Sequence, residues 1–301
     1  MSATIEFATG PVTWGVDFAD TPSNPPYTQV LDEIAEAGVK ALELGPVGYL
    51  PEDPATLRAE LDQRGLVAVG SFVFEDLHDP AQAEAIKGVT ERACRAIVAA
   101  EGSVLVIIDR PGEERMRTAG QPDRAKRLDD SGWRAMMRTT QALADIAEVH
   151  GLRPAFHPHA GSYVEFDDEV ERLLASTELD MCLDTGHLAF AGATPHEALA
   201  TYGSRLSHLH LKDIRGTVLA RVREKRLGFW DALSAGIFCP LGEGVVDCAA
   251  CFRSLETGGY AGFATIEQDR VPGSGTPLDD LRRSLQVVHR ARCGVHDDRT
   301  T

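Results

Sequence analysis

One pattern recurs along this chain: a short apolar run is followed by a turn and then by a segment of helical length. Helical segments such as "TQVLDEIAEAG" and "GWRAMMRTTQALADIAEVHG" carry apolar residues at spacings of three and four, and several end at a glycine. That spacing puts apolar side chains on one helix face, and glycine commonly follows a helix C-terminus. The pattern predicts strands over residues 7–14, 41–44, 67–74, 104–108, 153–157, 181–184, 208–212 and 263–267.

Eight strand and helix pairs in 301 residues predict an α/β fold, a single (β/α)8 TIM barrel, for which about 250 residues are typical. Hydrophobic residues make up 43% of the chain, which is enough for one large core. No linker interrupts the pattern, so we expect one domain over residues 1–301. It carries a long polar loop near 109–132, either a lid or merely a mobile segment, and an insertion near 214–247. The insertion follows the seventh strand, on the face where barrel active sites are built.

Charge and hydropathy restrict the kinds of partner that this chain can bind. The chain has 46 acidic and 30 basic side chains, and its formal net charge of -16 opposes binding to nucleic acid or to anionic lipid. The first residues, "MSATIEFATG", lack a basic region followed by an apolar one, and no stretch approaches the roughly 20 apolar residues that cross a bilayer. We therefore expect a cytoplasmic protein that acts on a small molecule.

Charged and imidazole side chains gather at the ends of the fifth to eighth predicted strands, which read "FHPH", "CLDTGH", "HLHLKD" and "TIEQD". In a parallel barrel these ends share one rim. Two carboxylates and two or more imidazoles buried there would be costly unless they were paired or bound to a cation. The order His157, Asp184, His210 and Glu267 offers mixed nitrogen and oxygen ligands. This mixture suits Mn, Co, Fe or Zn and gives less reason to prefer Mg or Ca.

From "GPVTWG" to "IEQD" the chain resembles the xylose-isomerase-like barrel superfamily, which holds sugar isomerases, keto-sugar epimerases, inosose dehydratases and type IV apurinic endonucleases. The stretches "HPHAGSYVE", "LDTGHLAFAG", "LSHLHLKDI" and "GIFCPLGEGVVD" resemble inosose dehydratases in particular. The resemblance implies that Asp184, His210 and Glu267 bind a divalent metal, Mn or Co first, with Zn, Fe or Mg as alternatives. The superfamily usually has a glutamate ligand on the fifth strand, where this chain offers His157 or His159. Strand register favours His157 as the ligand, with His159 facing the substrate.

The resemblance also implies a reaction, the dehydration of a 2-keto-cyclitol (an inosose). A base removes the proton alpha to the ketone, a beta hydroxyl leaves, and the metal stabilises charge on the ketone oxygen. His159, His187 and Lys212 are the candidate acids and bases, and Glu165 is either a catalytic acid or the start of the next helix. Lys212 is either a proton donor whose charged form burial disfavours or a salt-bridge partner. Expected substrate contacts are Trp14, which stacks on the ring or packs in the core, Glu43 and His208.

Other functions stay open. The same metal could move a proton between neighbouring carbons of a keto sugar, as in an isomerase or epimerase, and the segments at 43–54 and 71–80 do not repeat the dehydratase pattern. A barrel that binds a sugar without catalysis is a third possibility. An apurinic endonuclease is disfavoured, because the strand ends "SFVFED" and "VLVIIDR" lack histidine and the net charge opposes a polyanion. Barrels of this kind often associate through their outer helices, which leaves a homo-oligomer open.

Overall fold

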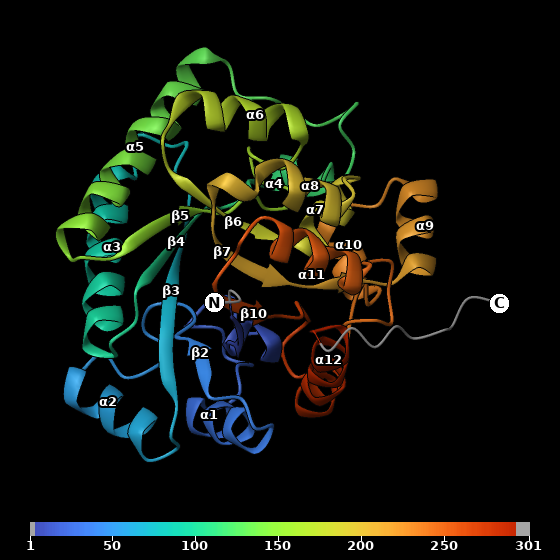
Figure 1. Ribbon diagram of the computed structural model, residues 1–301. Helices are drawn as coiled ribbons and strands as arrows, with labels where there is room; N and C mark the ends of the chain where they lie inside the picture. Colours follow the sequence, from blue (N-terminus) through green and yellow to red (C-terminus); the bar gives the residue numbers. More distant parts are fainter. Residues whose placement is uncertain (1–3, 293–301) are drawn as a thin grey trace.

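Eight parallel strands close into a barrel in this computed structural model, which describes residues 4–292 (Figure 1). The strands are β1 Ile5–Thr9, β2 Ala41–Glu43, β3 Val67–Glu75, β4 Val104–Asp109, β5 Arg153–Phe156, β6 Asp180–Asp184, β7 Leu206–Leu211 and β10 Gly262–Ile266. Each pairs with its neighbours in chain order, and β10 pairs with β1 to complete the ring. The predicted TIM barrel is therefore confirmed.

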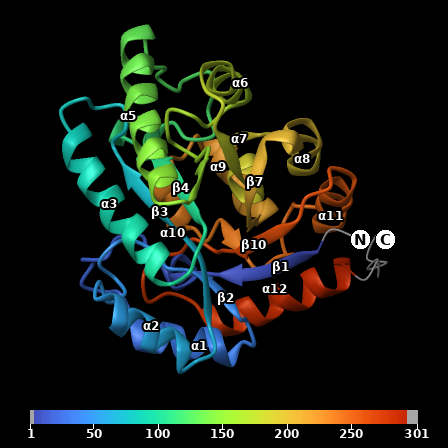
Figure 2. The same ribbon diagram turned by 60° about the vertical axis from the view of Figure 1, so that its left-hand side comes forward.

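The strands lie inside a layer of helices (Figure 2). The helices of this layer are α1 Tyr27–Glu36, α2 Pro54–Asp62, α3 Ala83–Ala99, α5 Asp130–Val149, α6 Asp167–Ser176, α8 Pro195–Tyr202, α11 Cys248–Thr257 and α12 Pro277–Arg292. Each turns an apolar stripe inward, as Ile86, Cys94 and Ile97 of α3 illustrate. Most of the buried hydrophobic side chains form one cluster between strands and helices, and full burial of each leucine or isoleucine contributes about 1.5–3 kcal/mol.

The first predicted strand is too long. Residues 7–14 were expected to form one strand, but β1 ends at Thr9 and Pro11–Trp14 is a 3-10 turn. Proline has no N–H to give to a sheet and fits the first turn of a helix, which explains the break at Pro11. Gly15 ends the turn with φ of 81°, a left-handed conformation that favours glycine. The chain therefore leaves the barrel earlier than predicted and crosses its mouth.

The polar segment near 109–132 contains a short helix, α4 Glu113–Arg117, and is pinned to the barrel by Arg115. The Arg115 side chain is fully buried and donates to both carboxylate oxygens of Glu169 at 3.0 and 3.1 Å and to Glu165 at 3.2 Å. Glu165 lies just before α6, and Glu169 lies in the first turn of that helix. This loop was expected to be either a lid or a mobile segment. In the structure, the buried ion pairs of Arg115 hold it in place.

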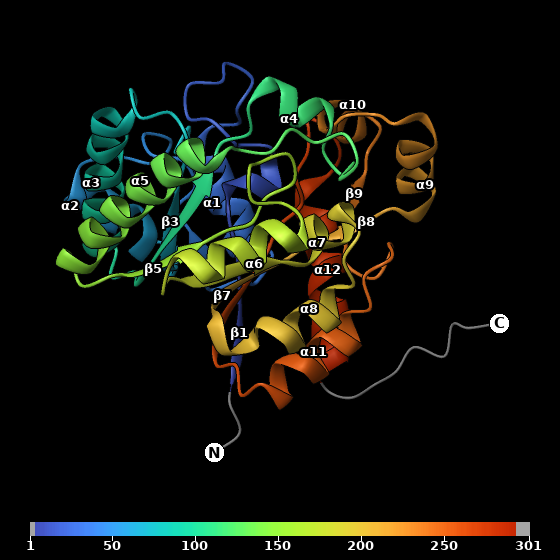
Figure 3. The ribbon, with the colours of Figure 1, turned by 90° about the horizontal axis from the view of Figure 1, so that it is seen from above.

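The insertion near 214–247 forms α9 Gly216–Lys225, α10 Phe229–Ser234 and a two-stranded ribbon of β8 Asp213–Ile214 and β9 Phe238–Cys239. Asp213, the last residue of "HLKD", organises the turn that follows: its carboxylate accepts the N–H groups of Gly242, Gly244 and Val246, each at 2.9 Å. Seen from above, α10 lies beside α4 (Figure 3). A last short helix, α7 Thr185–Ala191, follows β6. No helix within residues 4–292 has the length and apolar character of a membrane span.

Candidate metal and substrate site

A cavity opens at the carboxyl ends of the strands. Both ionisable and apolar side chains line it. The polar lining consists of Asp17, His157, His159, His210, Lys212, Glu267 and Asp269. The apolar lining consists of Val12, Phe18, Phe72, Phe74, Ile108, Met116, Phe229, Trp230 and Leu233. The polar residues come from the ends of β5, β7 and β10 and from the connection after β1, so the barrel topology gathers them from distant parts of the sequence.

Asp184 ends β6 and begins α7. Its Oδ1 accepts the backbone N–H groups of Gly186 at 2.8 Å and His187 at 3.0 Å, so the carboxylate is fixed as a helix cap. A side chain at Gly186 would come within 2.5 Å of Lys212 Cβ, so only glycine fits here. The other oxygen, Oδ2, is buried without a hydrogen bond and lies 3.7 Å from His210 Nδ1. Burial raises the pKa of Asp184. One oxygen is thus fixed by the backbone, and the other is available to a cation.

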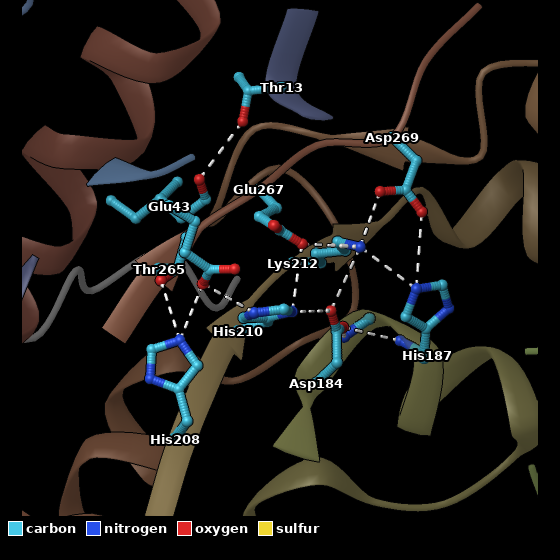
Figure 4. A network of polar contacts seen from close by, with 12 residues as sticks. Thr13, Glu43, Asp184, His187, His208, His210, Lys212, Thr265, Glu267 and Asp269 are labelled. Carbon is cyan, nitrogen blue, oxygen red and sulfur yellow. Dashed lines mark hydrogen bonds and ion pairs between the residues drawn. The ribbon is translucent and has the colours of Figure 1, made fainter. Parts of the chain in front are cut away.

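The orientation of His210 is set by Glu43 on β2 (Figure 4). One oxygen of Glu43 accepts from Nε2 of His208 at 2.8 Å and from Nε2 of His210 at 2.9 Å. Burial acts to raise the pKa of Glu43, but His210 and His208 hold it well below its ordinary value. An ionised carboxylate only accepts hydrogen bonds, so both imidazoles carry a proton on Nε2. His210 Nδ1 is therefore the atom that faces the site.

His210 Nδ1 lies 3.2 Å from Glu267 Oε2 and 3.7 Å from Asp184 Oδ2. Burial acts to lower the pKa of His210, but Cys182, Glu267 and Glu43 raise it well above the ordinary value. A lone pair facing two carboxylates would be repelled, so this nitrogen must hold a proton or share a cation with them. His210 Nδ1 is buried without a hydrogen bond and lies beside two carboxylates. One imidazole nitrogen together with two carboxylates is a donor set that suits a divalent metal.

The four predicted ligands lie together. His157, Asp184 and His210 each offer a ligand atom within 4.8 Å of the others, and Glu267 forms such a group with His210 and Glu43. His157 Nδ1 is buried without a hydrogen bond, and burial followed by the charge of His210 lowers the pKa of His157 well below its ordinary value. A neutral imidazole is the form that binds metal. The residues present therefore fit a divalent cation.

His159 belongs to a different group. Its ring lies on that of His187 with centroids 3.9 Å apart, and these two share a possible ligand cluster with Asp269 rather than with Asp184. Its Nδ1 donates to the carbonyl of Ala160 at 2.9 Å, which leaves Nε2 with a lone pair. Burial, followed by the charge of Lys212, lowers the pKa of His159 to about 4. Both histidines of "HPH" line the cavity, but His157 groups with Asp184 and His210, whereas His159 groups with His187 and Asp269.

Lys212 sits between three carboxylates. Its Nζ is 2.7 Å from Asp269, 3.1 Å from Glu267 and 3.3 Å from Asp184, and it lies 3.2 Å from His187 Nε2 (Figure 4). Lys212 was expected to be either a proton donor whose charged form burial disfavours or a salt-bridge partner. Burial acts to lower the pKa of Lys212, but Asp184, Asp269 and Glu267 raise it well above the ordinary value. The salt-bridge alternative describes the arrangement of this ammonium.

Besides Asp184 and His187, which are described above, four expected site residues do not line the cavity. Trp14 is buried in the core, and its indole N–H donates to Glu33 of α1 at 2.6 Å. Glu43 and His208 are buried beneath the cavity and contact each other rather than its lumen. Glu165 is held by Arg115 and by the N–H of Gly120 at 2.6 Å, and burial raises its pKa to about 7.

Sequence reasoning missed two cavity acids, Asp17 and Asp269. Asp269 follows Glu267 by two residues, the spacing that keeps side chains on one face of an extended chain, so the motif "IEQD" held a usable signal. Asp17 lies in the connection after the 3-10 turn, where no periodicity assigns a direction to a side chain. Burial followed by the charge of Asp269 raises its pKa to about 7.

Comparisons with known proteins agree with this architecture. Rhizopine catabolism protein MocC of Rhizobium meliloti is 33% identical over 284 residues, which cover 91% of this chain and 84% of that protein. An inosose dehydratase of Geobacillus kaustophilus is 30% identical over 289 residues, 93% of this chain and 92% of that protein. Both alignments run through the whole barrel, so the similarity is not confined to a motif.

Solved structures share the fold. The probable 3-DHS dehydratase AsbF of Bacillus anthracis superposes with a TM-score of 0.72 at 15% identity, over 95% of this chain and 99% of that one. A D-allulose 3-epimerase of Methylomonas sp. superposes with a TM-score of 0.69 at 18% identity, over 97% of this chain and 100% of that one. A family model described as xylose isomerase-like TIM barrel matches residues 31–290. With the closed eight-stranded barrel and this match in agreement, the chain belongs to the xylose isomerase-like TIM barrel family.

Proposed function

We propose that this protein is a metal-dependent hydro-lyase that removes water from a 2-keto-cyclitol of the inosose class. The observation that carries the proposal is the buried group of His157, Asp184 and His210, with Glu267 beside it, at the wall of a cavity. Relatives named inosose dehydratase that align with nearly the whole chain, at 26% and 30% identity, support this choice of reaction.

A divalent metal, Mn or Co first, would be held by His157, Asp184, His210 and Glu267 and would supply electrophilic stabilisation of charge on the ketone oxygen. Two carboxylates balance the charge of such a dication, and the imidazoles account for a preference over Mg. The chain itself sets the geometry of these ligands. The backbone of α7 fixes Asp184, and Glu43 fixes His210.

His159 is the base that this geometry favours for the proton alpha to the ketone. Its Nε2 has a lone pair, its ring lines the cavity, and its lowered pKa keeps it neutral at pH 7. His187 lies beneath it and contacts both Lys212 and Asp269, which suits a positioning role. Lys212 provides a fixed positive charge beside Glu267 and Asp269, where it stabilises negative charge that develops on the substrate.

The proposal is tested with purified protein loaded with Mn²⁺ or Co²⁺ and incubated with 2-keto-myo-inositol. We expect a new diketone or enone signal in ultraviolet absorbance and proton NMR, absent after metal removal. The Asp184→Asn variant should lose both bound metal and product formation. An isomeric ketose without loss of water would contradict the dehydratase and assign the protein to the isomerases or epimerases; bound metal with neither reaction would point to a sugar-binding barrel.

A further inference from the structure

Elimination of a hydroxyl needs an acid as well as a base, because hydroxide is a poor leaving group. If the proposed function holds, one side chain at the cavity must deliver a proton to the departing oxygen. Lys212 does not suit this role, because its ammonium is already paired with Asp269 at 2.7 Å, Glu267 at 3.1 Å and Asp184 at 3.3 Å. His159 suits the role of base, and His157, His210 and Glu267 are assigned to the metal. Among the polar lining residues, Asp17 and Asp269 remain.

Asp269 is already bound, because its Oδ1 lies 2.7 Å from Lys212 Nζ. Asp17 differs in that, among residues 4–292, its carboxylate has no hydrogen-bond or ion-pair partner. It is half-buried and lines the cavity, so a bound substrate and solvent can both reach it. This combination suits a group that gives up a proton and then recovers one from water.

The backbone explains how Asp17 reaches the site. Gly15 packs directly on the connection after β10: an added Cβ would lie 2.9 Å from the Pro272 backbone and 3.0 Å from the carbonyl oxygen of Arg270. This close approach joins the connection after β1 to the chain segment that carries Asp269. The segment that carries Asp17 is therefore held against the segment that carries Asp269, and both acids line the cavity although more than 250 residues separate them in the sequence.

We propose that Asp17 is the general acid that protonates the leaving hydroxyl. The base takes the alpha proton, the electron pair of the C–H bond forms the new double bond, and the bond from the beta carbon to oxygen breaks. The departing oxygen takes the proton of Asp17 and leaves as water. Asp17 is left as a carboxylate and regains a proton from solvent, while the base releases the alpha proton to solvent. One water is lost and no oxidation occurs.

The electrostatic surroundings suit this cycle. Asp17 is influenced by Asp269 and Glu267, which disfavour its ionised form, and by Lys212, which favours it. Burial is the largest cause, and the outcome is a pKa of about 7. A carboxyl group with this pKa is protonated in a substantial fraction of molecules at neutral pH and still releases its proton readily. An ordinary exposed aspartate would be almost fully ionised there.

The test separates the two half-reactions. In D2O, proton NMR of 2-keto-myo-inositol with the metal-loaded protein reports exchange of the alpha proton and, separately, formation of the diketone. For Asp17→Asn we expect exchange within about twofold of wild type and elimination slower by about 100- to 10,000-fold. The wild-type kcat should fall as pH rises above about 7, and the variant should lack this limb. Asp20→Asn, an exposed change in the same connection, should match wild type.

Three results would overturn the assignment: elimination by Asp17→Asn at the wild-type rate, a raised KM with unchanged kcat, or equal losses of exchange and elimination with normal metal content. In each of these the wild-type protein still eliminates water, so the proposed function stands while the role of Asp17 fails. If wild type exchanges the alpha proton but never eliminates, both proposals fail together. Metal content and thermal unfolding of Asp17→Asn confirm that the variant is folded.

Discussion

At the residue scale, the site depends on which nitrogen of His210 carries a proton. Glu43 accepts from Nε2 of both His208 and His210, which leaves Nδ1 of His210 for the proposed metal. Carboxylates behind metal-binding histidines commonly have this function, and they fix both tautomer and ring orientation. Glu43 was predicted to contact the substrate hydroxyls, but it lies beneath the cavity. Its position on a strand was visible in the sequence, whereas its depth inside the barrel was not.

We expect Glu43→Gln to weaken metal binding by about 10- to 100-fold, because an amide can donate as well as accept and no longer forces the proton onto Nε2. Isothermal titration of the metal-free protein with Mn²⁺ measures the affinity, and ¹⁵N shifts of the His210 ring report its tautomer directly. Glu33→Gln is the control, because the Glu33 carboxylate accepts a hydrogen bond from the Trp14 indole outside the barrel. Unchanged affinity and an unchanged tautomer in Glu43→Gln would contradict this role.

At the element scale, the segment near 109–132 is held by Arg115. The guanidinium and its two partners, Glu165 and Glu169, are at most 6% exposed. Removing one partner of a buried ion pair leaves an uncompensated charge, which typically costs about 3–5 kcal/mol. The sequence showed a polar loop rich in glycine and proline and predicted either a lid or mobility. It could not show that one arginine of the loop meets acids about fifty residues later, because that pairing depends on the tertiary fold.

We expect Arg115→Met to lower the free energy of unfolding by about 3–5 kcal/mol in urea titrations and to speed cleavage of the segment by trypsin at neighbouring basic residues. Arg117→Met is the matched control, because Arg117 pairs with Glu113 at the surface at 2.7 Å, where such pairs contribute little. Equal effects of the two substitutions would show that the buried network does not hold the segment in place.

At the scale of the whole molecule, the barrel order explains which parts of the site were predictable. Asp184 and His210 lie side by side because β6 and β7 are neighbours in sequence and in space, with these residues in register. Polar ends on consecutive strands therefore allowed the ligand set to be proposed from sequence. Contacts across the closed ring could not be predicted from the sequence. One example is the contact between Glu43 and His210, which are 167 residues apart. Irregular crossings such as the one that carries Asp17 were equally invisible.

Metal binding should stabilise the whole barrel, because its ligands come from four strands and converge only in the folded chain. A ligand that binds only the native state at 100 times its Kd adds about 2.7 kcal/mol to stability.

The stabilisation by metal should grow with pH. The metal-free protein holds an extra proton at His210, whose pKa is raised, and the metal-bound protein must release it, so affinity rises with pH. Thermal unfolding with and without Mn²⁺ at pH 6, 7 and 8 measures this. The shift in Tm should disappear in Asp184→Asn and persist in Asp180→Asn, a control at the exposed start of β6. A shift in Tm that stayed constant across this pH range would show that no proton leaves His210 when the metal binds.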